Sequence, residues 1–270
     1  MTLTEVRRLL DEFGIRPSKT LGQNFLIDSN ILHIILREAD VRRDETVLEI
    51  GPGLGVLTEV LVERVHRVVA IEKDPRLCAY LRQRFAQVEL IEGDAVEVLG
   101  SRFPVPGSGF KVVSNLPYSI STPILERLVD GDLKPRRMVV TLQREVAQRL
   151  AARPRRKEYG GLTLFTQLHY HCTIAHVVSP GCFYPSPRVD SAVVVLDRRD
   201  PRVQLEPGAP FHEIVRAGFS HRRKTLRKLL AGQAQVDEAF SRLGLSATAR
   251  AEELTLEEWI GLANALREAR

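Results

Sequence analysis

Residues 47–55, with the sequence VLEIGPGLG, constrain the fold more than any other segment of the chain. Their apolar run is short and ends abruptly at three glycines, Gly51, Gly53 and Gly55, which is typical of a buried parallel strand and not of a helix. Glycine lets a backbone turn tightly and approach a ligand closely, because it has no Cβ. Apolar residues then recur at helical spacing from Leu57 onward. Strand, glycine turn and helix together predict a doubly wound α/β sheet that binds a nucleotide at the carboxyl ends of its strands.

The composition is that of a globular protein with room for one large domain or slightly more. The 270 residues are 44% hydrophobic and 27% charged, and no apolar run approaches the length of a membrane span. The charged amphipathic N-terminus does not resemble a signal peptide. The three cysteines form no CxxC pair, as is usual in a reducing compartment. We therefore expect a cytoplasmic protein that does not enter a membrane.

Carboxylates follow the next two predicted strands at the same edge of the sheet. Glu72 ends the strand over residues 68–71, about twenty residues beyond the glycines, where this fold places an acid on ribose hydroxyls. A carboxylate suits that task because it accepts two hydrogen bonds from a cis-diol. Asp94 follows the strand over residues 88–91 and is expected to accept a hydrogen bond from an adenine amine. The alternatives are a surface glutamate and a plain helix N-cap.

The tetrapeptide Asn-Leu-Pro-Tyr, which follows the strand over residues 110–114, predicts the chemistry. The exocyclic amine of adenine is a poor nucleophile because its lone pair is delocalised into the ring. Asn115 offers a side-chain acceptor, and Pro117 restricts Leu116 to an extended conformation that fixes its carbonyl. Two such acceptors would hold the amine with its lone pair aimed at a methyl donor. Tyr118 offers a face on which a flipped base can stack, and a plain strand-to-turn Asn-x-Pro is the alternative.

Basic residues gather in two stretches of the chain. Residues 134–157 contain nine Lys or Arg and one acid, and residues 214–236 contain six Lys or Arg and no acid. Either stretch alone could be a solvated helix face, but two on one chain favour a nucleic-acid partner. The second stretch supplies cations that suit phosphate contacts. These cations are Arg222, Arg223, Lys224, Arg227 and Lys228.

The strand pattern stops near residue 200, and several short helices are expected from there to the C-terminus. We therefore expect a Rossmann-like domain at residues 1–199 and a small all-helical domain, which contacts RNA or the ribosome, at residues 200–270. The histidines and the cysteine between residues 169 and 176 match no standard zinc spacing, so no metal is expected.

Seven segments together resemble the family of adenine-N6,N6 dimethyltransferases that act on the 16S RNA of the small ribosomal subunit. They span nearly the whole chain and are SKTLGQNFLID, VLEIGPGLGVLT, IEKD, EGDA, SNLPYSIS, FYPSPRVDSAV and FSHRRKTLR. The resemblance implies a class I methyltransferase sheet and methyl transfer from S-adenosyl-L-methionine to N6 of two adjacent adenosines. It places these adenosines in the loop of the 3′-terminal hairpin of 16S RNA, in the immature small subunit.

The same resemblance implies roles for individual residues. Phe183, in FYPSPRVD, is expected to face the target base from the side opposite Tyr118. The expected catalytic set is Asn115, Leu116, Pro117, Tyr118 and Phe183. With Gly53 of the glycine turn included, the expected cofactor contacts are Asn24, Leu26, Gly51, Gly53, Glu72, Asp94 and Asn115.

Three other functions remain open. A 23S ribosomal RNA adenine methyltransferase of the macrolide-resistance type shares the LGQNFL segment and the NxPY motif. The segments RRKTLR and PSPRVDSAV, however, favour the small-subunit enzyme. A DNA adenine methyltransferase is disfavoured, because the sequence offers no candidate target-recognition domain. The chain could also serve as a ribosome-assembly factor whose binding matters more than its catalysis. We expect the protein to act as a monomer.

Overall fold

The computed structural model describes residues 1–18, 22–101, 109–131, 133–199, 203–233 and 235–267, and it divides into two compact units. The first unit comprises Met1–Ala147 and His171–Arg198, and the second comprises Gln148–Tyr170 and Arg199–Arg270. The expected division into residues 1–199 and 200–270 differs from these units at residues 148–170 and at Arg199. Residues 148–170 belong to the second unit, because Tyr159 and Leu168 are buried in the same core as the C-terminal helices.

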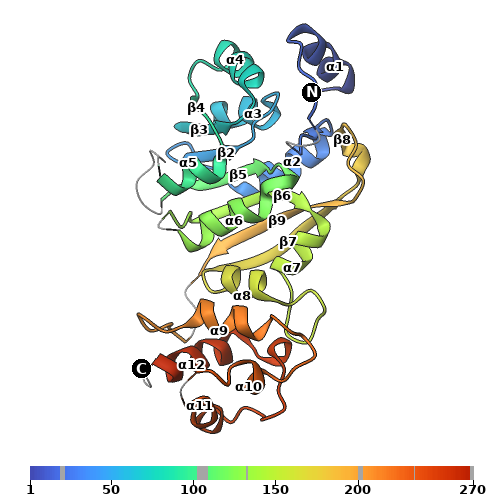
Figure 1. The fold of residues 1–270 in the computed structure, drawn as a ribbon. Helices are drawn as coiled ribbons and strands as arrows, with labels where there is room; N and C mark the ends of the chain where they lie inside the picture. Colours follow the sequence, from blue (N-terminus) through green and yellow to red (C-terminus); the bar gives the residue numbers. More distant parts are fainter. Residues whose placement is uncertain (19–21, 102–108, 132, 200–202, 234, 268–270) are drawn as a thin grey trace. The chain divides into compact units, whose positions relative to one another are not determined.

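The first unit is built on a seven-stranded sheet with the strand order β4-β3-β2-β5-β6-β9-β7 (Figure 1). The strands from β4 to β6 in this order run parallel, and β9 lies antiparallel to β6. Parallel neighbours need crossover connections, which the helices supply, so the predicted α/β fold class is confirmed. The strands are β2 (Thr46–Ile50), β3 (Arg67–Glu72), β4 (Glu89–Glu92), β5 (Lys111–Asn115), β6 (Arg137–Gln143), β7 (Tyr170–Val178) and β9 (Ser191–Arg198).

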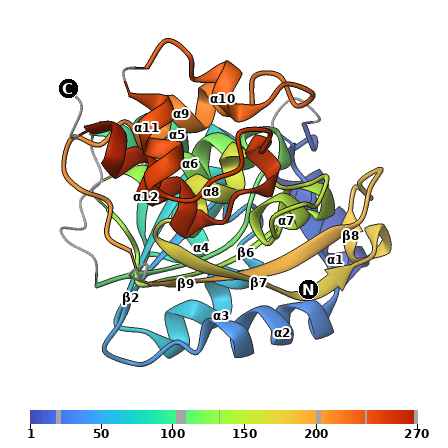
Figure 2. The ribbon, with the colours of Figure 1, turned by 90° about the horizontal axis from the view of Figure 1, so that it is seen from below.

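Helices lie on both sides of this sheet, and the strands between β4 and β7 in the strand order are largely buried. The helices include α1 (Leu3–Glu12), α2 (Ser29–Ala39), α3 (Val56–Arg64), α4 (Pro75–Arg84), α5 (Ala95–Ser101), α6 (Ser121–Asp130) and α7 (Arg144–Leu150). Figure 2 shows α2 and α3 on one side of the sheet and α5 and α6 on the other. On the α2 and α3 side, Ile35 and Leu61 share one buried apolar cluster with Val139 of β6.

Helix starts in this unit follow the capping residues that the sequence offers. Asp28 accepts hydrogen bonds from the backbone N–H groups of Asn30 (2.8 Å) and Ile31 (3.1 Å), which fixes the start of α2. Asp74 caps α4 in the same way, and Pro75 occupies the first helical position. Both helices therefore begin at residues whose chemistry favours a helix start.

A small two-stranded sheet is not predicted by the sequence. It pairs β1 (Phe25–Leu26) with β8 (Phe183–Tyr184) in antiparallel register, so that Leu26 lies opposite Phe183. The backbone N–H of Ile27 also donates to the carbonyl of Cys182 over 2.9 Å. The segment ahead of the glycine turn is thereby joined to the FYPSPRVD segment, far along the chain.

The second unit is built from helices around its own apolar core. Trp259, Phe211 and Tyr159 are almost completely buried there. The Trp259 ring stacks on Phe219 at a centroid distance of 5.9 Å. The helices are α8 (Gly161–Gln167), α9 (Phe211–Gly218), α10 (Leu226–Leu229), α11 (Val236–Arg242) and α12 (Leu256–Arg267).

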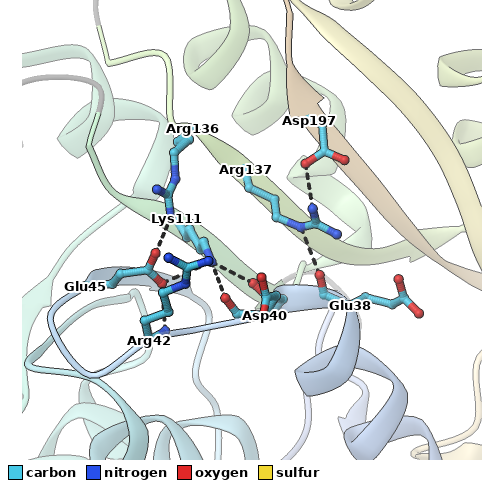
Figure 3. Close-up of polar contacts among 9 residues, drawn as sticks. Glu38, Asp40, Arg42, Glu45, Lys111, Arg136, Arg137 and Asp197 are labelled. Carbon is cyan, nitrogen blue, oxygen red and sulfur yellow. Dashed lines mark hydrogen bonds and ion pairs between the residues drawn. The ribbon is translucent and has the colours of Figure 1, made fainter.

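A charged cluster ties the end of α2 to the amino ends of the strands (Figure 3). Lys111 of β5 is 3% exposed and donates to the carbonyls of Ala39 (3.1 Å) and Asp40, where a cation is favoured by the helix dipole. Its Nζ also lies 3.0 Å from Oε2 of Glu45, and Oε1 of Glu45 accepts a further bond from Arg136. Burial works to raise the pKa of Glu45, but hydrogen bonds from the backbone and from Lys111 outweigh it and lower that pKa.

Candidate active site

A pocket lies at the carboxyl ends of β2, β3 and β5, where this class of sheet binds ligands. It brings together every predicted cofactor-binding residue and all but one of the predicted catalytic residues. Phe183 is the exception, because it does not line the pocket. The predicted residues among the lining are Asn24, Leu26, Gly51, Gly53, Glu72, Asp94, Asn115, Leu116, Pro117 and Tyr118.

The glycine turn forms a wall of the pocket at which any side chain would be strained. Gly51 and Gly53 have φ values of +68° and +58°, in the left-handed region that favours glycine. A Cβ on Gly51 would lie 3.0 Å from the ring of Pro117, and one on Gly53 would lie 3.0 Å from the ring of Phe25. The bare backbone is therefore the only surface that this turn can present.

Glu72 is held at the end of β3 by backbone donors. Its Oε2 accepts from the N–H of Gly53 over 3.2 Å, and its Oε1 accepts from the N–H groups of Lys73 (2.8 Å) and Asp74 (2.9 Å). Burial raises the pKa of Glu72, and the three backbone hydrogen bonds work in the opposite direction. The carboxyl is thus fixed against the glycine turn, at the edge where the sequence places it.

Asp94 lines the pocket and is also the cap of α5, so both of its predicted interpretations have support. Its Oδ1 accepts from the backbone N–H of Val96 over 2.9 Å, and its Oδ2 accepts from Nζ of Lys73 over 2.8 Å. The hydrogen bond from Lys73 is the main reason that the pKa of Asp94 lies below its usual range. A contact between Asp94 and an adenine amine stays a prediction.

Asn115 carries a buried acceptor with no partner among the described residues. Its Nδ2 donates to the carbonyl of Asn24 over 2.9 Å, which leaves Oδ1 without a hydrogen bond. Buried polar atoms are rarely left unpaired, and an unpaired one at a pocket wall marks a place for a ligand. The backbone N–H of Leu116 donates to the carbonyl of Thr141 over 3.0 Å, so the turn after β5 is anchored to β6.

Tyr118 follows Asn115 and Pro117 at the start of a short 3-10 helix, η1 (Tyr118–Ile120). Its hydroxyl is hydrogen bonded to Oγ of the buried Ser191, a partner that the sequence did not reveal. Burial raises the pKa of Tyr118 to about 12, so the phenol stays neutral. The Tyr118 ring meets the Phe183 ring edge to face, with centroids 6.5 Å apart and planes at 77°. The two rings contact each other and do not form a parallel clamp.

The segment around Asn24 closes the pocket from the N-terminal side. A Cβ on Gly22 would lie 2.9 Å from the backbone nitrogen of Ser119, so this segment lies directly on the turn after Asn115. Gln23 extends the contact, because its Nε2 donates to Oδ2 of Asp74 over 3.3 Å. Residues 19–21 of the SKTLGQNFLID motif lie outside the described residues.

Glu49 is a pocket-lining carboxyl to which sequence reasoning gave no role. It is 2% exposed, and its Oε2 accepts a hydrogen bond of 2.6 Å from Oγ1 of the buried Thr58. Burial raises the pKa of Glu49 to about 8, and the charge of Glu72 adds to the rise. The signal in the sequence is an acid inside an otherwise apolar buried strand.

We expect the ligand-free protein to lose stability through Glu49 as the pH rises from about 4.5 to about 8. In this window the folded protein keeps the Glu49 proton and the unfolded chain releases it, so deprotonation favours unfolding. Glu49→Gln keeps the shape and does not titrate. Its free energy of unfolding relative to the wild type should therefore be higher at pH 8 than at pH 5, by on the order of a few kcal/mol. Urea denaturation at the two pH values measures these free energies of unfolding. If the wild type and Glu49→Gln differ by the same amount at both pH values, Glu49 is ionised in the folded state.

The cations predicted to bind RNA all lie in the second unit and differ in their surroundings. Arg222 donates to the carbonyls of Lys157 (2.8 Å) and Tyr159 (3.4 Å). Arg227 is paired with Asp237 over 2.5 Å. The remaining three, Arg223, Lys224 and Lys228, are exposed, and no carboxylate of the described residues pairs with them.

The described part of the chain offers neither a metal site nor a membrane-spanning helix. No group of three or more His, Cys, Asp or Glu side chains there is placed to hold a metal ion. None of the helices in that part of the chain has the length and apolar character needed to cross a bilayer.

Comparisons with known proteins agree with one another. The family model described as ribosomal RNA adenine dimethylase matches residues 15–268. The chain is 42% identical over 265 residues to ribosomal RNA small subunit methyltransferase A of Geobacter metallireducens, covering 94% of this chain and 96% of that protein. It is 36% identical over 261 residues to the protein of the same name from Clostridium acetobutylicum, covering 94% and 95%.

Two solved structures have a similar fold. A dimethyladenosine transferase from Plasmodium falciparum superposes with a TM-score of 0.79 at 24% identity, covering 91% of this chain and 98% of that one. The 23S rRNA methyltransferase ErmE superposes with a TM-score of 0.69 at 28% identity, covering 90% and 99%. The small-subunit enzymes are thus more similar in sequence than this 23S enzyme is.

Proposed function

Because this chain belongs to the ribosomal RNA adenine dimethylase family, we propose that it methylates N6 of adenosines in small-subunit ribosomal RNA with S-adenosyl-L-methionine as methyl donor. It is an S-adenosylmethionine-dependent ribosomal RNA adenine dimethyltransferase. Its substrate is the pair of adjacent adenosines in the 3′-terminal hairpin loop of 16S RNA, in the immature subunit. The observation that carries the proposal is the unpaired, buried Oδ1 of Asn115 at the wall of a glycine-lined pocket.

The pocket residues fit the methyl donor. The bare backbone of Gly51 and Gly53 leaves room for a nucleoside, and Glu72 is suited to its ribose hydroxyls. Asn24, Leu26 and Asp94 complete the proposed binding surface. When bound, S-adenosylmethionine supplies an electrophilic methyl group on a sulfonium.

Asn115 is proposed to hold the target amine. Its amide is oriented by donation to the carbonyl of Asn24, so Oδ1 is left to accept a hydrogen bond from the exocyclic N–H. Such a bond turns the nitrogen lone pair away from the ring and positions it for attack. One acceptor also suits both rounds of methylation, because the monomethylated amine still has one N–H.

Tyr118 is proposed to support the base by stacking. Its hydroxyl is bonded to Ser191, which helps to orient the ring, and the Phe183 ring packs against it edge to face. In the proposed arrangement the base therefore stacks on Tyr118, and Tyr118 in turn packs against Phe183. This differs from the expected arrangement, in which Phe183 faces the base directly.

The substrate is tested by methylation of small-subunit particles from cells that lack this enzyme. We expect label from the methyl donor in two adjacent adenosines of 16S RNA, mapped by mass spectrometry of nuclease fragments. Mature subunits that already carry the dimethyladenosines are the matched control and should accept no label. Label in 23S RNA instead would contradict the proposal and favour an enzyme of the macrolide-resistance type.

A further inference from the structure

We infer that residues 153–157, here called the 153–157 loop, form a second phosphate-binding segment that works with Arg223 and Lys224 on RNA. Arg222 is the positioning residue that holds the two segments together. The inference rests on the proposed function, since it names a further contact surface for the same RNA substrate. It also gives the last part of the first basic stretch, residues 148–157, a defined place on the second unit.

The 153–157 loop is exposed and yet firmly held. The backbone N–H of Arg155 donates to the carbonyl of Glu252 over 2.7 Å, and the N–H of Tyr159 donates to the carbonyl of Arg156 over 3.1 Å. The buried ring of Tyr159 anchors the end of the loop, because its hydroxyl donates to the carbonyl of Leu254 over 2.8 Å. A fixed loop presents its side chains at low entropic cost to a ligand.

Arg222 joins this loop to the basic segment that follows α9. Its guanidinium donates to the carbonyls of Lys157 (2.8 Å) and Tyr159 (3.4 Å). Nearby, the ring of Tyr159 meets the ring of Phe219 at 6.1 Å. Two independent contacts therefore place the loop beside the segment that carries Arg223. Because Arg222 is bonded to neutral carbonyls, its own positive charge is not cancelled by these bonds.

Most cations of the surface formed in this way have no acidic partner among the described residues. Its basic residues are all exposed and are Arg153, Arg155, Arg156, Lys157, Arg222, Arg223 and Lys224. Among the described residues, no carboxylate pairs with Arg155, Arg156, Arg223 or Lys224. Lys157 does have an acidic partner, because its Nζ lies 3.5 Å from Oε1 of Glu158. By contrast, Arg227 of the same unit is neutralised by Asp237. Gathering unpaired cations costs repulsion, which the negative charge of a bound phosphate backbone offsets. Binding also releases the counterions condensed on that backbone, so it depends on salt.

The test is the salt dependence of binding to small-subunit particles that lack the methylation. Arg155→Gln/Arg156→Gln should weaken binding about tenfold or more and lower the slope of log affinity against log salt by about 1 to 2, since each phosphate contact contributes about 0.7 to 0.9. Arg43→Gln/Arg64→Gln is the control, because it removes the same charge from exposed positions of the first unit. It should leave the slope unchanged.

Arg222→Lys tests the positioning role separately, because it keeps the charge and loses both carbonyl contacts. We expect weaker particle binding together with faster trypsin cleavage within the 153–157 loop. Cofactor affinity, measured by calorimetry, should not change. If Arg222→Lys binds particles as tightly as the wild type, Arg222 has no positioning role.

The outcomes separate the inference from the proposed function. One possible result is a slope of log affinity against log salt that is steep in the wild type and the same in Arg155→Gln/Arg156→Gln. That result would overturn the inference and leave the proposed function standing. A wild-type protein that neither binds nor methylates these particles would overturn the proposed function itself. If Arg155→Gln/Arg156→Gln loses affinity for particles but not for protein-free 16S RNA, the loop contacts an acidic ribosomal protein. That result also overturns the inference.

Discussion

Asn115→Ala is expected to reduce single-turnover methyl transfer by about a hundredfold or more at saturating methyl donor, as loss of a group that acts in the transition state does. The variant removes the buried Oδ1 acceptor at the pocket wall and leaves the carbonyl of Asn24 without its donor. Folding and particle binding should be largely retained, because both rest on residues elsewhere. Rapid-quench measurement with excess enzyme isolates the chemical step.

Glu72→Ala is the matched comparison for this result. Glu72 lines the same pocket, but its proposed contact is with the ribose and not with the reacting atoms. Removing such a charged acceptor costs on the order of 2 to 3 kcal/mol, so the dissociation constant of the methyl donor should rise by about 30-fold or more. At saturating methyl donor, the single-turnover rate of Glu72→Ala should approach that of the wild type. If Asn115→Ala also regains the wild-type rate there, Asn115 is only a ligand of the cofactor and the proposed acceptor role fails.

The sheet was predictable from the sequence because its signals are local. The glycine turn, the acids that end neighbouring strands and the Asp28 cap each lie within a few residues of what they determine. Strand ends of a parallel sheet meet at one edge, so Glu72 and Asn115 could be placed in one pocket without knowing any side-chain contact.

Contacts between distant segments were not predictable, because no local pattern encodes them. The two-residue strands of the small sheet are too short to show a period, and their pairing joins Leu26 to Phe183. The bond between Tyr118 and Ser191 spans 73 positions. The two basic stretches gave no sign that Arg222 would bond to the backbone carbonyl of Lys157 in the other stretch. Tertiary packing decides these partners, and the same is true of the assignment of residues 148–170 to the second unit.

Lys111→Met is expected to lower the free energy of unfolding by about 3 to 5 kcal/mol, the usual cost of breaking a buried ion pair from one side. The variant keeps the apolar stem of a side chain that is 3% exposed. It leaves Glu45 without the lysine partner that helps to keep its pKa low, and it leaves the carbonyls of Ala39 and Asp40 without their donor. Urea denaturation measures the change.

Two further variants show whether the burial of this pair causes the loss. Arg84→Met removes one partner of an exposed pair with Glu59, whose side chains are 46% and 49% exposed, and it should cost less than about 1 kcal/mol. Lys111→Met/Glu45→Gln removes both buried charges, so its cost should be smaller than the sum of the two single variants. If Lys111→Met costs no more than Arg84→Met, the cluster at the end of α2 does not hold this edge of the sheet. The proposed methyl-transfer pocket lies at the opposite ends of the same strands. If Lys111→Met keeps the wild-type affinity for the methyl donor, the two edges of the sheet are energetically separate.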